Sequence, residues 1–177
     1  MALDTVVEDA IRSNKGFVVI MAGSDSDAEH INKLSKELTK YQLPHQVRIC
    51  SAHKEPGELT HIIKEYNAVP GALAYIAVAG GTDALSGTLS FNVPKPVISC
   101  PPDAPNESCL TNPPGSSNAY IARPANAARF CAQLFSDLPG TPYKELLTQE
   151  AEKKVVGLRN ADGIFSVFPY KPVEVKK

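Results

Sequence analysis

The sequence has no apolar run that approaches the roughly 20 residues needed to span a bilayer, and no excess of charge of one sign. Lys and Arg number 18 against 19 Asp and Glu, a formal net charge of -1. There is therefore no global cationic field to attract nucleic acid or anionic lipid. The first ten residues, MALDTVVEDA, lack both a secretory apolar core and a mitochondrial Arg-rich pattern. We expect a cytoplasmic protein that binds neither nucleic acid nor membrane.

Cysteine is scarce, and its spacing is uninformative. The four cysteines form no C-x-x-C pair and show no zinc spacing. Their density is too low for a disulfide scaffold. We therefore expect reduced thiols, mostly buried, at Cys50, Cys100, Cys109 and Cys131.

Several motifs of cofactor and metal sites are also missing. The chain contains no G-x-G-x-x-G and no G-x-x-x-x-G-K-[ST], so dinucleotide and nucleoside triphosphate binding lack support. A Ser-His hydrolase is not supported, because the chain contains no G-x-S-x-G nucleophile elbow. The group Asp25, Asp27, Glu29 and His30 offers too few oxygen ligands at loop spacing, and its last two members fall in a predicted helix. We expect no metal and no cofactor.

What is present is an alternation of short apolar runs with helical stripes, in a chain of single-domain length. The pattern predicts an α/β fold, a parallel sheet with helices on both faces and a further C-terminal helix over 143–159. The predicted strands are 16–22, 45–50, 72–79, 96–99 and 119–122. The segment 100–118 is either a long ordered loop or a flexible lid.

The chain divides into three parts. We expect an N-terminal helical lead over 1–14, one main domain over 15–160 and a C-terminal tail over 161–177.

Three predicted strands end in polar segments: GSDSD, SAHK and GGTD. Ligands of parallel α/β sheets bind outside the carboxyl ends of the strands, so these segments are expected to converge on one site. Gly23 and Ser24 open a helix whose free N–H groups suit a phosphate, and Asp27 suits ribose hydroxyls. The plainer alternative is that Ser26 or Asp27 only caps the helix and Gly23 only makes the turn.

His53 is the sole histidine at a predicted strand end, and its ordinary pKa of about 6.5 suits proton transfer near neutral pH. Lys54 adds a point charge and Ser51 a hydroxyl, although a merely polar loop is equally compatible with these residues. The other histidines, at positions 30, 45 and 61, are expected on helix or strand surfaces.

Four segments together resemble one enzyme family in their order and spacing. They are AGSDSD at 22–27, SAHKEP at 51–56, VAGGTDALSG at 78–87 and PVISCPP at 96–102. Over residues 17 to about 136 the chain resembles aminoimidazole ribonucleotide (AIR) carboxylases of purine synthesis. SAHK with PVISCPP is similar to the branch that uses carbon dioxide directly, which includes the carboxylase half of an animal enzyme fused to SAICAR synthetase.

This resemblance implies a three-layer αβα, flavodoxin-like fold and a homo-octamer whose sites are built partly from neighbouring subunits. It also implies a carboxy-lyase that joins carbon dioxide reversibly to AIR without metal, biotin or ATP. His53 matches the proton-transfer histidine. The resemblance and the loops together predict these substrate-binding residues: Gly23, Ser24, Asp27, Ser51, Ala52, Lys54, Gly80, Gly81, Thr82, Asp83 and Leu85.

The chain departs from the branch pattern at three positions. Gly81 and Thr111 stand where arginines are usual, and Asp83 stands in place of an amide. Losing a guanidinium that pairs an anion typically costs about 1.5–3 kcal/mol. A catalytically weakened domain that binds the ribonucleotide or scaffolds an oligomer is therefore an alternative. The family's mutase branch is another, although Lys54 and the SCPP run argue against it.

Overall fold

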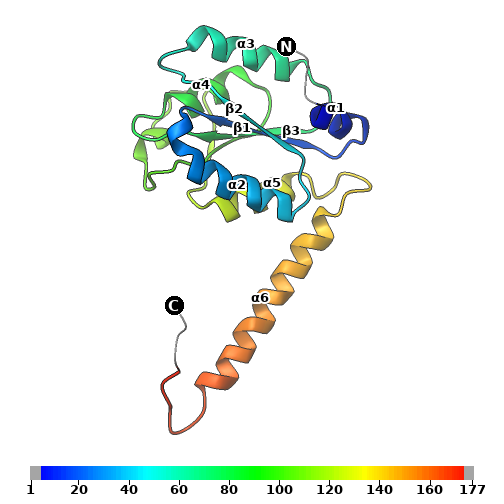
Figure 1. Ribbon diagram of the computed structural model, residues 1–177, viewed down its shortest axis with the longest axis vertical. Helices are drawn as coiled ribbons and strands as arrows, with labels where there is room; N and C mark the ends of the chain where they lie inside the picture. The colour runs from blue at the N-terminus through cyan, green and yellow to red at the C-terminus, as the bar shows by residue number, and fades with distance from the viewer. Residues whose placement is uncertain (1–4, 174–177) are drawn as a thin grey trace.

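The computed structural model describes residues 5–173 as a three-layer αβα sandwich with a flavodoxin-like sheet and a projecting C-terminal helix (Figure 1). Five parallel strands lie in the order β2-β1-β3-β4-β5. The elements are α1 (Thr5–Arg12), β1 (Phe17–Ala22), α2 (Ala28–Lys40), β2 (His45–Ile49), α3 (Pro56–Asn67), β3 (Leu73–Val78), α4 (Ala84–Asn92), β4 (Val97–Ser99), β5 (Ala119–Tyr120), α5 (Pro124–Leu134) and α6 (Tyr143–Phe165). Two 3-10 turns, η1 (Asp25–Asp27) and η2 (Glu107–Leu110), follow β1 and β4.

The two central strands, β1 and β3, are buried at every position. Their side chains alternate between two apolar clusters, because successive residues of a strand point to opposite faces. One cluster joins Val18 and Ile20 to α2 and α5, and the other joins Phe17 and Met21 to α3 and α4. Figure 1 shows these helix pairs on opposite faces of the sheet. A polar side chain would be costly inside these strands, so polar groups are confined to their ends.

Backbone hydrogen bonds align the ends of neighbouring strands. Gly23 N–H donates to the Val78 carbonyl at 2.9 Å, and Cys50 N–H donates to the Ala22 carbonyl at 2.8 Å. The loops that follow β1, β2 and β3 therefore start side by side at one edge of the sheet.

Most predicted elements are confirmed, with three differences. Helix α4 was not expected, because its sequence ALSGTLSFN has little helical periodicity. Helix α6 extends to Phe165 rather than Arg159, since no proline or strong stop signal interrupts it. The segment 100–118 contains η2 and many hydrogen bonds, which favours the ordered loop over the flexible lid.

All four cysteines are free and buried, as expected. Helix α1 sends Val7 and Ala10 into the core, whereas residues 1–4 of the expected lead and 174–177 of the expected tail lie outside the described residues. The division into lead, domain and tail stays a prediction. Within residues 5–173 no helix has the length and apolarity that crossing a membrane would require.

Helix α6 is attached to the body only near its start (Figure 1). Tyr143 is buried, and its hydroxyl donates to the Lys15 carbonyl at 2.7 Å. Two turns later the Glu150 carboxylate accepts hydrogen bonds from Tyr41 and, at 2.6 Å, from Arg129. Lys154 adds a 2.6 Å ion pair within the helix. This cluster ties α6 to α2 and α5.

The Glu150 cluster predicts a pH-dependent contribution to stability. Burial raises the pKa of Glu150, but hydrogen bonds from Lys154, Tyr41 and Arg129 outweigh it and lower this pKa to about 2. A lowered carboxyl pKa stabilises the fold above the unfolded value near 4.5, and this stabilisation is lost as the pH falls toward 2. Glu150→Gln should lower Tm at pH 7 by about 2–4 °C, the shift expected from about 1 kcal/mol in a domain of this size.

Thermal unfolding at pH 7 and pH 3 measures this effect. The difference between wild type and Glu150→Gln should be smaller at pH 3. Glu152→Gln, in an exposed position on the same helix, is the matched control and should behave like wild type. A Tm difference for Glu150→Gln that does not change with pH would contradict the assignment.

Candidate functional site

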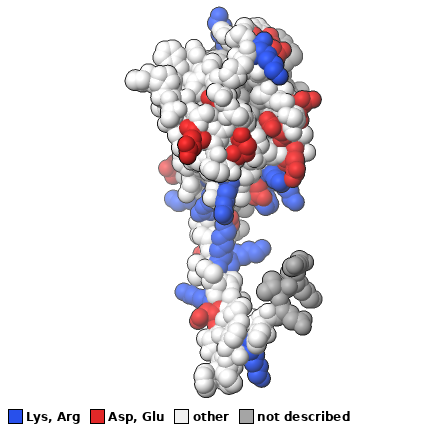
Figure 2. All heavy atoms as spheres, turned by 90° about the vertical axis from the view of Figure 1, so that its left-hand side faces the viewer, with Lys and Arg blue, Asp and Glu red and all other residues white. Residues whose placement is uncertain are grey.

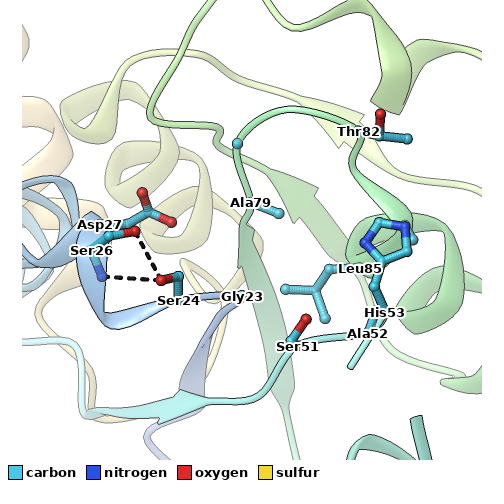
Figure 3. A pocket seen from close by; sticks show the side chains of 12 residues that line it. Gly23, Ser24, Ser26, Asp27, Ser51, Ala52, His53, Ala79, Thr82 and Leu85 are labelled. Atoms are coloured by element: carbon cyan, nitrogen blue, oxygen red, sulfur yellow. Dashed lines mark hydrogen bonds between the residues drawn. The ribbon is translucent and has the colours of Figure 1, made fainter. Parts of the chain in front are cut away.

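A pocket of about 230 Å³ opens at the carboxyl ends of β1, β2 and β3 (Figure 3). Its walls come from the three polar loops that the sequence singled out. The lining residues are Gly23, Ser24, Ser26, Asp27, Ser51, Ala52, His53, Ala79, Gly80, Thr82, Ala84 and Leu85. The predicted convergence of the loops is therefore a feature of the structure.

The first loop turns from β1 into α2 through η1. Ser24 caps this turn, because its Oγ accepts hydrogen bonds from the backbone N–H of Ser26 at 3.2 Å and from the Ser26 hydroxyl at 2.8 Å (Figure 3). Asp27, one of the two caps expected for the following helix, does occupy the N-cap position of α2. Asp27 makes no capping hydrogen bond at the start of α2. Its carboxylate remains available to a ligand in the pocket.

The second loop carries His53 on the far side of the pocket from Ser24 and Asp27 (Figure 3). A turn holds this loop, in which Ser51 Oγ accepts from Lys54 N–H at 3.3 Å and the Ser51 carbonyl accepts from Glu55 N–H at 2.8 Å. Within the described residues the His53 ring makes no hydrogen bond, so both ring nitrogens are free for a ligand. The Lys54 side chain is exposed and does not line the pocket, although its backbone belongs to this loop.

The third loop separates the predicted residues into two groups. Gly80 and Thr82 line the pocket together with Leu85 from the start of α4, whereas Gly81 and Asp83 do not. Asp83 is only 4 % exposed, and its Oδ1 caps α4 by accepting from Ser86 N–H at 2.9 Å. An acidic side chain at a helix N-terminus is stabilised by the helix dipole, which accounts for Asp83 structurally.

Gly81 has a φ of +65°, and its backbone hydrogen-bonds to the segment that follows β4 rather than facing the pocket. Thr111, the other position where arginine was expected, is exposed after η2 and also does not line the pocket.

The pocket has little positive charge of its own. Among its described lining residues none is Lys or Arg, and Asp27 is an acid. Figure 2 looks onto this edge of the sheet and shows Asp and Glu scattered over the body, while Lys and Arg lie at its top, at its base and along α6. An anionic ligand would therefore be met by backbone N–H groups and hydroxyls at the start of α2, with Lys54 as the nearby cation.

Two histidines that were expected on the surface are in fact half-buried. His30 Nε2 lies 3.0 Å from the Cys100 carbonyl, and burial lowers the pKa of this histidine. His45 contacts Ser35 Oγ at 2.7 Å and the Leu43 carbonyl at 2.9 Å. His61 is exposed, as expected. Both half-buried rings connect elements of the fold, which leaves His53 as the histidine of the pocket.

Three lining residues were missed from sequence. Ser26 was interpreted only as a helix cap. Its position two residues after Ser24, in the same polar loop, was the pattern that could have indicated a place in the site. Ala79 and Ala84 have no reactive group and gave no signal at all. In residues 5–173 no cluster of three or more His, Cys, Asp or Glu could hold a metal ion.

Comparison with known proteins identifies the family. The AIR carboxylase family model matches residues 17–154. The chain belongs to the AIR carboxylase family. A Treponema denticola phosphoribosylaminoimidazole carboxylase is 37% identical over 126 residues, which are 68% of this chain and 79% of that protein. An Archaeoglobus fulgidus phosphoribosylaminoimidazole carboxylase is 33% identical over 150 residues, 81% of this chain and 82% of that protein.

The family also includes longer proteins and solved structures. A mouse bifunctional phosphoribosylaminoimidazole carboxylase/phosphoribosylaminoimidazole succinocarboxamide synthetase is 37% identical over 67% of this chain, which spans only 29% of the mouse protein. The crystal structure of Treponema denticola PurE superposes with a TM-score of 0.78 at 32% identity, covering 84% of this chain and 97% of that one. The resemblance found in the sequence motifs and the predicted fold are both confirmed.

Lys54 is predicted to act on anionic ligands through charge alone, because its side chain does not line the pocket. Lys54→Ala should weaken binding of ribose 5-phosphate about threefold or more, the size expected for an exposed charge pair. The difference should shrink as salt rises, since salt screens exposed charges. Titration calorimetry at low and high ionic strength measures it.

Lys64→Ala, an exposed lysine on α3, is the control and should leave binding unchanged. Equal affinities for wild type and Lys54→Ala at low salt would remove Lys54 from the site.

Proposed function

We propose that this chain is the carbon-dioxide-using AIR carboxylase of de novo purine synthesis, with His53 as its proton-transfer residue. The observation that carries the proposal is the pocket itself, which has Ser24 and Asp27 on one side and His53 on the other. A phosphorylated ribose would occupy the α2 side, where hydroxyls and helix N–H groups lie. The base would then extend toward His53.

The chemistry needs little beyond position and one proton carrier. The ring carbon next to the amino group of AIR is nucleophilic, as in an enamine, and forms the new bond to the carbon of carbon dioxide. The ring proton at that carbon must then leave, and the imidazole of His53 accepts it. In the reverse direction the protonated ring returns the proton to the carbon, and the carbon–carbon bond to the carboxylate breaks.

The pocket wall beside His53 suits carbon dioxide. Ala79 and Leu85 are nearly fully buried, at 8% and 2% exposed, and Ala52 packs against the same cluster. An apolar wall holds an uncharged gas molecule and excludes water from the reacting carbon. The sugar side of the pocket is polar by contrast, so the two ends favour different parts of the reactants.

Two residue patterns favour the carboxylase branch over the mutase branch. SAHK at 51–54 and SCPP at 99–102 resemble the branch that uses carbon dioxide, and Lys54 stands where the mutase motif typically has arginine. The substrate supplied decides between them, since a mutase needs the carboxylated amine and a carboxylase needs bicarbonate as a source of carbon dioxide.

A catalytically weakened binding domain is the second candidate, and Gly81 is the observation that favours it. With glycine here and Thr111 away from the pocket, two expected guanidinium groups are missing. Such a domain would bind the ribonucleotide and leave it unreacted.

Assembly into an oligomer larger than a dimer, an octamer by family resemblance, belongs to the same proposal. Beyond Glu150 the helix α6 leaves the body with Val155, Val156 and Leu158 at 45%, 53% and 71% exposed. Further exposed apolar side chains follow at Ile164 and Phe165. An exposed apolar surface of this kind marks an interaction site. A second copy of the chain is the proposed partner.

Light scattering at micromolar concentration tests this assembly. The wild type should be larger than a dimer, and Leu158→Glu should reduce the mass without lowering the Tm of the monomer, because the Leu158 side chain is 71% exposed. A wild-type monomer would refute the assembly.

His53→Asn is predicted to abolish turnover and to leave binding of the carboxylated product nearly unchanged. The amide keeps much of the shape of the ring but carries no proton near pH 7. General acid–base groups typically contribute about 10²–10⁴ in rate, far more than so conservative a change alters affinity. Carboxylation with bicarbonate, decarboxylation, and product binding by calorimetry are the measurements.

Rates of His53→Asn within about tenfold of wild type would refute the role of His53. The control is His61→Asn, an exposed histidine on α3, which should retain full activity. A wild type that binds product but turns over neither bicarbonate nor the carboxylated amine would favour the weakened binding domain.

A further inference from the structure

The segment from Cys100 to Asn106 connects two walls of the pocket. At its start the Cys100 carbonyl lies 3.0 Å from His30 Nε2 on α2. Its next residues include Pro102, which borders a small cavity together with Ser26, Asp27 and His30. Its end contacts the loop after β3. This segment, here termed the strap, therefore contacts helix α2 and the loop after β3.

Asp103, in the middle of the strap, contacts the loop after β3. Its Oδ2 accepts a hydrogen bond from Gly81 N–H at 2.7 Å, and its Oδ1 accepts one from Asn106 Nδ2 at 3.0 Å. The same Asn106 nitrogen donates to the Gly81 carbonyl at 2.8 Å. Ser108 Oγ also donates to this carbonyl, at 3.2 Å, so Asp103 is the side chain that holds the Gly81 N–H, while Asn106 and Ser108 hold its carbonyl.

The residues on either side of Gly81 line the pocket. Gly80 and Thr82 both belong to its wall, and Gly81 itself has a φ of +65°. Glycine loses more backbone freedom on ordering than any other residue, and the loop begins with two of them. Without partners, Gly80 and Gly81 would sample many conformations, and a ligand would have to select one.

The Asp103 carboxylate is suited to this task. The Gly81 N–H and then Asn106 lower the pKa of Asp103, so the group is ionised at neutral pH. Hydrogen bonds to an ionised group are about twice as strong as neutral ones. Asp103 does not line the pocket, so any effect on a ligand must pass through the loop.

We infer that Asp103 is a positioning residue, which holds residues 80–82 in the conformation that forms the pocket wall. Where the inference concerns affinity for a ribonucleotide, it rests on the proposed function. Prior ordering of the loop reduces the entropy that a ligand must offset on binding. Asp103 therefore contributes to affinity, while the proton transfer at His53 proceeds without it.

The test compares Asp103→Ala with Glu107→Ala, which removes the same charge from an exposed position in the same region. Hydrogen exchange of peptides that span 79–85, measured by mass spectrometry, reports whether the loop is held. Calorimetry with the carboxylated ribonucleotide reports affinity, and steady-state kinetics separate KM from kcat. Tm checks that each variant is folded.

Asp103→Ala should exchange faster over 79–85, bind about fivefold to tenfold more weakly, and raise KM with kcat within about twofold of wild type. Glu107→Ala should match wild type in every measurement. Asp103→Asn should lie between, because its amide oxygen still accepts from Gly81 N–H while its NH2 group faces the donor of Asn106.

Unchanged exchange in Asp103→Ala would overturn the positioning role, as would faster exchange with unchanged affinity and KM. If the wild type binds no ribonucleotide, the proposed function fails. The exchange comparison then decides the positioning role alone, with faster exchange supporting it and unchanged exchange overturning it.

Discussion

The site depends on the parallel hydrogen-bond ladder that joins β1 to β2 and β3. Its last bonds, from Gly23 N–H to Val78 and from Cys50 N–H to Ala22, lie at the ends of the strands. The three polar loops begin at these strand ends, so the alignment of the strands is enough to bring their side chains together. A one-residue shift of register would turn each strand's side chains to the opposite face and move the loops apart. Because both faces of β1 and β3 are buried, such a shift is strongly disfavoured.

Three aspartates near the carboxyl ends of the strands have different structural roles. Asp83 is buried and caps α4, Asp103 holds the backbone of Gly81, and Asp27 makes no capping bond and faces the pocket. Burial and local partners decide these roles. Only the carboxylate without a structural hydrogen bond remains available for a ligand.

The sequence predicted the sheet, most of the helices and the convergence of the loops because these follow from local patterns. Buried parallel strands appear as continuous apolar runs, and their polar ends share one edge. Helix α4 was not predicted, because its buried face includes Ser86 and Ser90, which interrupt the apolar stripe. The contact of Gly81 with Asp103 was not predicted, because the two residues are 22 positions apart in sequence and no local pattern pairs them. Tertiary hydrogen bonds between loops leave no periodic pattern in the sequence from which they could be predicted.

Gly81, a departure from the family pattern, forms one structural unit with Asp103. Where the family resemblance predicts arginine, the chain has Gly81 with a φ of +65°, a conformation that L side chains rarely adopt. A Cβ at this position would meet no atom within 4 Å, so backbone strain rather than lack of space disfavours other residues. The turned backbone is what directs Gly81 N–H at the Asp103 carboxylate. An arginine at 81 would thus require a different loop conformation and would separate Asp103 from its donor. The absence of a side chain at position 81 and the Asp103 contact are both compatible with this one backbone geometry.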